Sequence, residues 1–325
     1  LSCKGTAYGQ GEFCVGNEDT FRFLETVLEE VMEVFPSEMI HIGGDEANKA
    51  HWKECPKCQQ RMQAEGLADV DELQSYLIKR IARFVESKGR RIVGWDEILD
   101  GGLAQGATVM SWRGTEGGIE AMSMGHDVIM SPGRYCYLDH TQDAPFREPE
   151  SIGGYLPLDS VYVYEPIEKS MPEDRRYHLL GVQANLWTEY ITEDAHAEYM
   201  YWPRAFAIAE TGWSQPENKD LKDFRRRALH ALEVLKDQGY NVFDLKNEYG
   251  ERKLAQTGLD HKAKGCKVTY NPDLPWPKYY PAAGETTFTD GVIGGWTYSD
   301  QRWQGFLSPI DVTIDLGSVQ EVHYV

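Results

Sequence analysis

The chain has 325 residues, of which 41% are hydrophobic, and it carries a formal net charge of −19. This hydrophobic content can supply a sizeable core, which excludes an intrinsically disordered chain. The negative charge argues against nucleic acid and anionic membrane surfaces as partners. No apolar stretch is long enough to span a bilayer. Composition therefore favours a globular protein that binds a neutral or cationic ligand.

The first 250 residues alternate between helical and strand-like sequence. Amphipathic helices are expected over 17–35 and 71–88, because apolar residues recur there at helical spacing. Pro36 follows the first as a stop, and Gly89 is placed to cap the second. Further helical sequence is expected over 117–124, 195–211 and 221–238.

Short apolar strands separate these helices. They are expected over 38–43, 91–95, 107–112, 127–131 and 179–187. Such alternation is typical of a parallel sheet with crossover helices. Each strand exits into polar or aromatic residues, as in a (β/α)8 barrel, whose chemistry lies at the C-terminal strand ends. We therefore predict an α/β fold, a (β/α)8 TIM barrel whose remaining strands, about three in number, lie upstream of Leu1.

The alternative fold is an open doubly wound sheet. Such a sheet normally binds a nucleotide at a glycine-rich turn, and the sequence contains no GxGxxG motif or P-loop. The barrel is therefore the favoured prediction.

The sequence changes character after about residue 250. Residues 251–267 are polar and linker-like, whereas 268–325 are rich in Pro, Gly, Thr and aromatic residues. Apolar and polar residues alternate over 310–316, which predicts a half-buried antiparallel strand. We expect a barrel over 1–250, a linker over 251–267 and the start of a truncated β-sandwich module over 268–325.

Two adjacent carboxylates follow the strand expected at 38–43. Gly43 and Gly44 precede them and allow a sharp turn and the close approach of a ligand. Neighbouring carboxylates repel each other, so one tends to stay ionised while the other keeps a proton to donate. This predicts an acid–base site at Asp45 and Glu46. The plainer alternative is a polar loop in which one of them caps the next helix.

The sequence contains six cysteines. Cys3 and Cys14 flank a glycine-rich loop and could pair. Cys55 and Cys58 have the CxxC spacing of half a zinc site, but no second CxxC or HxxxH follows at a suitable distance. We therefore expect a local disulfide or free thiols, and no metal site. A disulfide would suit an exported or periplasmic protein, although the cysteines alone do not decide this.

Several motifs in this order resemble those of the glycoside hydrolase family 20 β-N-acetylhexosaminidases. The resemblance covers roughly residues 1–250. The stretch HIGGDE at 41–46 resembles the catalytic acid motif on the family's fourth strand. Four further motifs resemble those of the family's strands five to eight. They are GWDE at 94–97, SWRG at 111–114, YLD at 137–139 and LWTE at 186–189. Segments within 289–305 resemble the start of the discoidin-like module often appended to bacterial members.

The resemblance implies a retaining glycosidase assisted by the substrate's own 2-acetamido group. Glu46 would be the general acid and base, and Asp45 would hold and polarise the acetamido N–H. Tyr137 would donate a hydrogen bond to the acetamido oxygen, which attacks the anomeric carbon and forms an oxazolinium intermediate. The products would be terminal β-linked GlcNAc or GalNAc removed from glycans, without a cofactor.

Other residues of the same motifs would bind the sugar. Aromatic rings suit the apolar C–H faces of a sugar and its N-acetyl methyl group, and those implied are Trp95, Trp112 and Trp187. For any one of them the alternative is core packing. Asp139 and Glu189 would bind hydroxyl groups, and His41 would support the acid pair. The family's sugar-binding arginine and the histidine beside the acid would lie upstream of Leu1.

Three alternatives stay open at this point. They are a family member that releases a disaccharide such as lacto-N-biose, a non-catalytic carbohydrate-binding protein on a decayed barrel, and a metal hydrolase built on His41, Asp45, Cys55 and Cys58. A decayed site should have lost an acid or Tyr137, and all are present. Both ends of the chain look cut, so we expect a fragment of a longer, periplasmic or secreted protein.

Overall fold

The computed structural model describes residues 1–3, 12–256, 258–273 and 276–323. The chain divides into two compact parts. The first part consists of Leu1–Cys136, Tyr164–Ala184 and Ile208–Asn218. The second part consists of Tyr137–Val163, Asn185–Ala207 and Lys219–Val325. The predicted boundaries near residues 250 and 267 stay a prediction.

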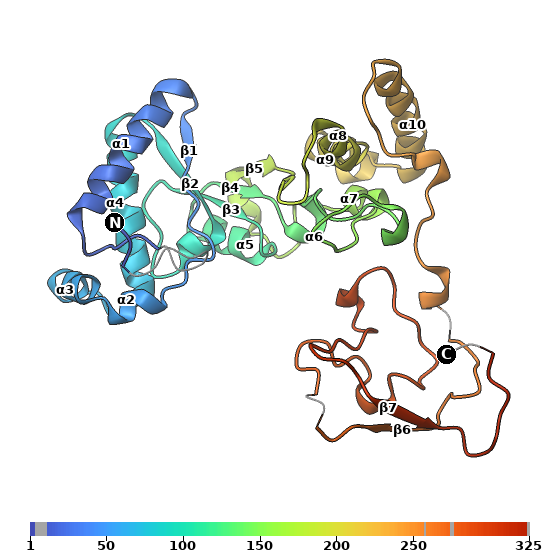
Figure 1. Ribbon diagram of the computed structural model, residues 1–325. Coiled ribbons are helices and arrows are strands. Elements are labelled where there is room, and N and C mark those ends of the chain that lie inside the picture. The colour runs from blue at the N-terminus through green and yellow to red at the C-terminus, as the bar shows by residue number, and fades with distance from the viewer. Residues whose placement is uncertain (4–11, 257, 274–275, 324–325) are drawn as a thin grey trace. The chain divides into compact units, whose positions relative to one another are not determined.

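The first part is built on a parallel sheet of five strands (Figure 1). The strands are β1 (Met39–His41), β2 (Arg91–Trp95), β3 (Thr108–Ser111), β4 (Val128–Met130) and β5 (Leu179–Val182). They lie side by side in chain order, and every neighbouring pair is parallel. A doubly wound sheet reverses its strand order at a switch point, whereas a barrel does not. The sequential order agrees with the predicted barrel.

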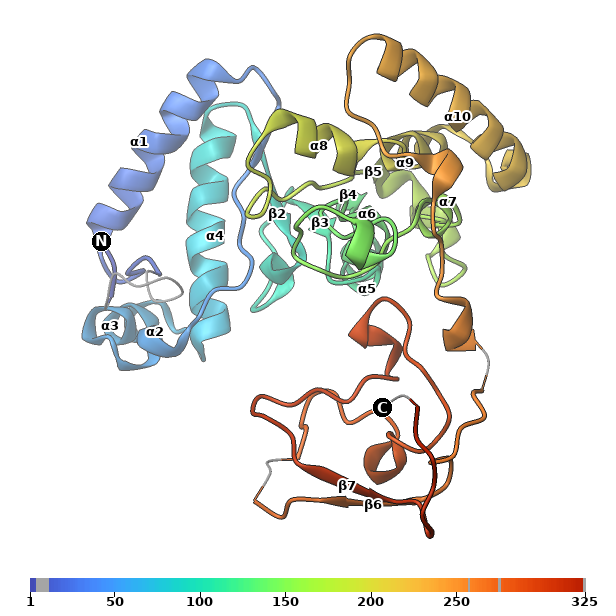
Figure 2. The same cartoon turned by 45° about the vertical axis from the view of Figure 1, so that its right-hand side comes forward.

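Two long helices, α1 (Glu18–Val34) and α4 (Val70–Ser87), lie side by side in both views (Figures 1 and 2). Each begins where a side chain caps free backbone N–H groups, Asn17 for α1 and Asp69 for α4. The apolar face of α4 is buried against the sheet side, including Leu73, Ile78, Ile81 and Val85. The helices predicted over 17–35 and 71–88 are therefore confirmed.

Short helices fill the connections of the first part. They are α2 (Ala50–Glu54), α3 (Pro56–Glu65), α5 (Glu116–Ser123) and α6 (Gly133–Cys136). A single turn of 3-10 helix, Asp96–Leu99, follows β2 directly. It places the two acids of the GWDE motif at the end of that strand.

The strand predicted over 179–187 is shorter than expected. Its neighbour β4 ends at Met130, and the last ladder bond runs from the Gln183 N–H to the Met130 oxygen. Without a partner strand beyond that point the ladder stops, and β5 ends at Val182. Asn185 instead forms an isolated parallel bridge with Tyr137.

The second part contains α7 (Leu158–Tyr162), α8 (Asp194–Tyr201) and α10 (Leu221–Asp237). The helix predicted over 195–211 is two helices, because Pro203 lacks an N–H and interrupts it before α9 (Arg204–Trp213). The antiparallel pair β6 (Lys267–Tyr270) and β7 (Val312–Asp315) confirms the strand predicted over 310–316. The complete sandwich stays a prediction.

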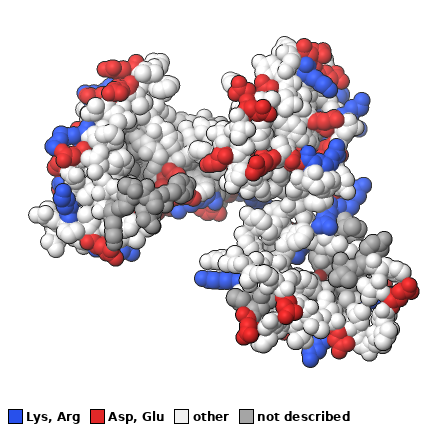
Figure 3. All heavy atoms as spheres, in the orientation of Figure 1, with Lys and Arg blue, Asp and Glu red and all other residues white. Residues whose placement is uncertain are grey.

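Charge is spread over the surface. On the face shown in Figure 3, Lys and Arg side chains are scattered among Asp and Glu rather than gathered into one patch. Within the described residues, none of the helices combines the length and the apolar character that crossing a membrane requires.

Candidate active site

A turn of two glycines carries the chain from β1 to the acid pair. Gly43 and Gly44 have φ angles of +73° and +102°, which glycine adopts without the strain of a side chain. A Cβ atom at Gly44 would also lie 2.6 Å from Cγ2 of Ile98. Glycine is therefore required at this position for both conformation and space.

Neighbouring elements hold this turn in place. The Trp95 N–H, at the end of β2, donates to the Gly43 oxygen at 2.9 Å. Gln74, a buried residue of α4, donates from Nε2 to the Gly44 oxygen at 2.7 Å. The backbone that leads to the acids is thus fixed by the sheet and by the helix beside it.

Glu46 has a φ angle of +49°. For a residue with a side chain this left-handed conformation is uncommon. Among the described residues, only Ala282 and Gln301 are other non-glycine residues with positive φ. Such backbone strain clusters at active sites, where the surrounding structure enforces it. Both Asp45 and Glu46 present exposed side chains.

His41 supports the turn from the end of β1. Its Nδ1 accepts a hydrogen bond from the Gly43 N–H at 3.1 Å, so the proton of the neutral ring is placed on Nε2. Its ring lies 4.8 Å from that of Trp95, at an interplanar angle of 61°. Partial burial lowers the pKa of His41, and the negative charge of Asp45 opposes this shift. The acceptor role of Nδ1 and the direction of the pKa shift both favour the neutral imidazole.

The acids that follow β2 orient residues of the next strand's motif. Glu97 accepts a hydrogen bond from Nε1 of Trp112 at 2.9 Å, and Asp96 accepts one from Nε of Arg113 at 2.8 Å. Both carboxyl groups are buried. Burial and a hydrogen bond with Glu97 raise the pKa of Asp96 to about 6, although Arg113 opposes the shift. The sequence analysis identified this motif but missed that its two acids position the side chains of Trp112 and Arg113.

The two tryptophans of this part differ in their surroundings. Trp95 is 8% exposed and belongs to a core cluster with Val93 and Met110. Trp112 is only partly buried and packs against that cluster. Trp95 thus packs in a core cluster, and its role in sugar binding stays a prediction. The indole N–H of Trp112 is fixed by its hydrogen bond to Glu97.

In the second part, Tyr137 and Trp187 come together. The bridge between Tyr137 and Asn185 aligns the two segments, and the Leu138 N–H donates to the Asn185 oxygen at 2.7 Å. The rings of Tyr137 and Trp187 lie 6.1 Å apart, edge to face at 64°. Trp187 is 40% exposed, so its ring offers a surface on which a ligand can stack.

Asp139 is a buried acid with an unused oxygen. It is 5% exposed, and its Oδ1 has no hydrogen-bond partner in the described part of the chain. Burial raises the pKa of Asp139 to about 6, with a contribution from Glu189 that the charge of Arg204 opposes. A buried acceptor left without a partner calls for an explanation, and a bound ligand hydroxyl would supply one. Glu189 itself is exposed.

Arg204 is a residue that sequence reasoning missed. It is entirely buried, and its two Nη atoms donate hydrogen bonds of 2.6–3.0 Å to backbone carbonyls. The acceptors are the oxygens of Leu138, His140, Leu156 and Met200. Burial lowers the pKa of Arg204 to about 10, which leaves it charged at neutral pH. It fixes the loop on both sides of Asp139, and no local pattern marks it in the sequence.

The structure thus forms two groups of predicted site residues. The first part holds His41, Asp45, Glu46, Trp95 and Trp112, and the second holds Tyr137, Asp139, Trp187 and Glu189. In the first group the residues end or follow β1, β2 and β3, as the sequence predicted. In the second group, Trp187 lies beyond the end of β5 and beside the bridge between Tyr137 and Asn185. Acids and aromatic rings at the carboxyl ends of sequentially ordered parallel strands place the chain in the class of (β/α)8-barrel proteins.

The comparison with known families agrees with this class. A family model described as "Glycosyl hydrolase family 20, catalytic domain" matches residues 3–216. The chain belongs to this family. The match ends before the tail, so the discoidin-like module stays a prediction.

Curated relatives carry hexosaminidase names. The chain is 49% identical over 233 residues to a beta-hexosaminidase of Porphyromonas gingivalis, which covers 71% of this chain and 30% of that protein. It is 40% identical over 196 residues to a beta-hexosaminidase of Vibrio furnissii, which covers 59% of this chain and 32% of that protein. The chain therefore spans about a third of the length of these relatives.

Solved structures share the fold. A family 20 exo-β-N-acetylglucosaminidase from Vibrio harveyi, in complex with N-acetylglucosamine, superposes with a TM-score of 0.67 at 31% identity over 73% of this chain and 37% of that one. A β-N-acetylhexosaminidase from Bacteroides fragilis gives a TM-score of 0.63 at 28% identity over 75% of this chain and 50% of that one.

Proposed function

We propose that the protein to which this chain belongs is a β-N-acetylhexosaminidase, which removes terminal β-linked GlcNAc or GalNAc from glycans. The observation that carries the proposal is the turn after β1, where two glycines deliver two exposed acids and the backbone of Glu46 is left-handed. Membership of the family and the names of the relatives support it.

The proposed reaction uses the substrate as its own nucleophile. Glu46 gives its proton to the glycosidic oxygen, and the bond to the anomeric carbon breaks as the acetamido oxygen attacks. Asp45 stays ionised, accepts the acetamido N–H and stabilises the positive charge of the oxazolinium ring. Glu46 then takes a proton from water, which opens the ring with overall retention at the anomeric carbon.

The remaining residues would position the sugar. Tyr137 donates a hydrogen bond to the acetamido oxygen and aligns it for attack, an effect of orientation that can be large. Trp112 and Trp187 offer ring faces to the sugar, and the free Oδ1 of Asp139 accepts from a hydroxyl group. A periplasmic or secreted location stays a prediction.

The deciding experiment compares two aryl glycosides with the full-length protein. An aryl 2-acetamido-2-deoxy-β-glucoside should be hydrolysed, whereas the matching substrate with a 2-hydroxyl should not, because its nucleophile is gone. Hydrolysis of neither substrate, with binding of N-acetylglucosamine retained, would instead support the non-catalytic carbohydrate-binding alternative. Equal hydrolysis of both would reject the substrate-assisted mechanism.

A further inference from the structure

Four cysteines from separate segments meet at one point in the first part. Cys3 and Cys14 precede α1, Cys55 lies at the start of α3, and Cys58 lies in its first turn. Their Sγ atoms all lie within 4.8 Å of one another. The sequence analysis looked for the second half of a zinc site after Cys58, whereas the structure supplies it from residues before Cys55.

Three of the distances between the sulfur atoms are close to those of a tetrahedral metal site. They are 3.4 Å for Cys3–Cys58, 3.7 Å for Cys14–Cys55 and 3.8 Å for Cys14–Cys58. A tetrahedron with Zn–S bonds of about 2.3 Å has edges of about 3.8 Å. A disulfide bond needs about 2.05 Å. Cys14 moreover lies near both cysteines of the CxxC, which fits a shared ion better than separate pairs.

Backbone N–H groups point at two of these sulfur atoms. The Cys58 N–H donates to the sulfur of Cys55, and the Gly16 N–H donates to the sulfur of Cys58. Hydrogen bonds of this kind orient the ligands around a metal. Cys14 and Cys58 are buried, and Cys3 and Cys55 are half-buried, so the cluster is largely shielded from water.

Gly16 allows the two backbones to approach. A Cβ atom there would lie 2.1 Å from the carbonyl carbon and oxygen of Lys57 and 2.6 Å from the Cys58 nitrogen. These are backbone atoms that cannot move aside cheaply, so any larger residue would separate Cys14 from the CxxC turn. The glycine is thus independent support for a cluster built from both segments.

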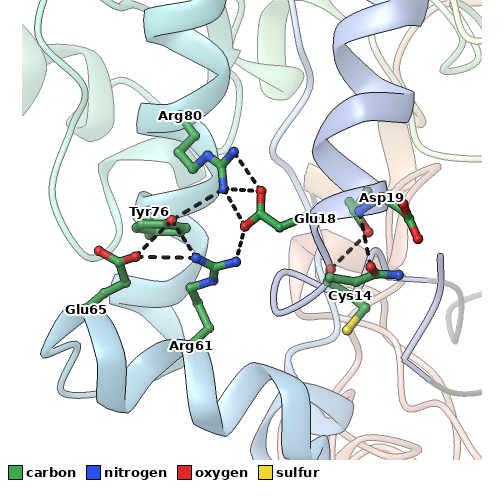
Figure 4. Close-up of polar contacts among 9 residues, drawn as sticks. Cys14, Glu18, Asp19, Arg61, Glu65, Tyr76 and Arg80 are labelled. Carbon is green, nitrogen blue, oxygen red and sulfur yellow. Dashed lines mark hydrogen bonds and ion pairs between the residues drawn. The ribbon is translucent and has the colours of Figure 1, made fainter.

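An ionic network fixes the elements around the cluster (Figure 4). Glu18, at the start of α1, accepts hydrogen bonds from Arg80 of α4 at 2.9 and 3.1 Å and also from Arg61 of α3. Tyr76 accepts from Arg61 at 3.2 Å. The segments that carry Cys14 and the CxxC are therefore held together from a second side.

We propose that Cys3, Cys14, Cys55 and Cys58 bind one Zn²⁺ ion in a structural tetrathiolate site. Binding would displace the thiol protons into solvent, with no oxidation of sulfur. Thiolates select zinc over the hard cations Mg²⁺ and Ca²⁺. Four protein ligands fill the tetrahedron and leave no position for substrate, so the ion would stabilise the fold and take no part in hydrolysis.

The zinc site would stabilise the structure next to the acid pair. Phe13, next to Cys14, accepts a hydrogen bond through its backbone oxygen from Nε1 of Trp52 at 3.0 Å. Both residues line a cavity of about 470 Å³ that His41 and Asp45 also line. A zinc ion that ties residues 12–16 to the helices after the acid pair would therefore fix one wall of this cavity.

The first test uses the unaltered full chain, purified without chelators. Elemental analysis should find about one zinc per chain. After denaturation with a chelator and no reductant, iodoacetamide should modify all six cysteines. Replacement of zinc by Co²⁺ should give the intense visible bands and the thiolate-to-metal charge-transfer band of tetrahedral tetrathiolate cobalt. Absence of zinc, with only Cys136 and Cys266 modified, would overturn the proposal in favour of two disulfides.

Single variants then assign the ligands. Cys55→Ser and Cys58→Ser should lose zinc and the cobalt charge-transfer band, whereas the matched controls Cys136→Ser and Cys266→Ser should keep both. Cys136 and Cys266 are outside the cluster. Unchanged zinc content in Cys58→Ser would contradict the assignment. The cobalt spectrum of the unaltered chain decides the matter even if a cluster variant fails to fold.

Discussion

At the scale of single residues, the two neighbouring acids differ in backbone conformation and in proposed task. Glu46 occupies the left-handed region, while Asp45 does not. Since the turn is tied to β2 and α4 by hydrogen bonds, the backbone that leads to both acids is held at a defined place relative to the sheet. Substituting each acid in turn should separate the two roles.

Glu46→Gln removes the proton donor and should affect poor leaving groups most. Acid–base catalysis typically contributes ~10²–10⁴-fold to the rate. We expect a loss of kcat in that range on a natural disaccharide and a much smaller loss on an aryl glycoside with a stable leaving group. Equal losses on both substrates, measured by steady-state kinetics, would show that Glu46 is not the general acid.

Asp45→Asn removes a charge while keeping the shape of the side chain. Because the charge is needed mainly once the oxazolinium ring forms, kcat should fall by ~10²–10³-fold, whereas binding of N-acetylglucosamine should change little. A thiazoline analogue of the intermediate should bind the parent protein tightly and lose this advantage in the variant. If Asp45 were a covalent nucleophile, a 2-fluoro glycoside would instead leave an adduct on it, visible by mass spectrometry.

Asp139→Asn should stabilise the protein at neutral pH. The raised native pKa, about 6, means that the folded state binds the proton more tightly than the unfolded state. The free energy of unfolding should therefore fall as the pH rises from about 4 to about 6. Asn cannot ionise, so the variant should gain ~1–3 kcal/mol at pH 7 and little at pH 3.5.

A matched control for this experiment is Asp223 on α10. Hydrogen bonds from Arg227 and Arg226 lower the pKa of Asp223. Ionisation of this carboxyl group therefore does not reduce the stability of the fold. Asp223→Asn should show no gain at pH 7 in denaturant titrations. A loss of stability in Asp139→Asn at every pH would mean that the ionised form of Asp139 is needed by the fold.

At the scale of elements, helices and strands could be predicted from periodicity and end signals, as for α1, α4 and α10. The turn that leads to Asp45 and Glu46 could be predicted from its two glycines, Gly43 and Gly44. The premature end of β5 could not be predicted, because it depends on where β4 stops. Arg204 and the cysteine cluster were missed for a similar reason, since their partners are far away in the sequence.

Arg204→Met should destabilise the second part strongly. The variant keeps the apolar stem but leaves four backbone oxygens without their donors, which should cost at least ~3 kcal/mol. Arg226→Met is the matched control, because that side chain is 72% exposed on α10. Unfolding by denaturant gives both free energies. A similar change in the free energy of unfolding of both variants would show that the hydrogen bonds of Arg204 to the four backbone oxygens do not stabilise the second part.

At the scale of the whole molecule, the proposed zinc ion predicts a metal-dependent stability. A ligand that binds only the folded state raises the free energy of unfolding, so a strong chelator should lower the melting temperature of the unaltered chain. The same treatment should leave Cys55→Ser unaffected, because it has no ion to lose. Added Zn²⁺, but not Mg²⁺, should restore the melting temperature. A melting temperature that the chelator does not change would contradict the proposed zinc site.

The sequential order of the sheet also bears on how the chain folds. Only short connections join β2 to β3 and β3 to β4, so these strands can pair with little loss of loop entropy. Residues 42–90 separate β1 from β2, and residues 131–178 separate β4 from β5. Contacts between distant segments form more slowly. We therefore expect the middle strands to pair first during folding, and β1, which leads to the acid pair, to join them later.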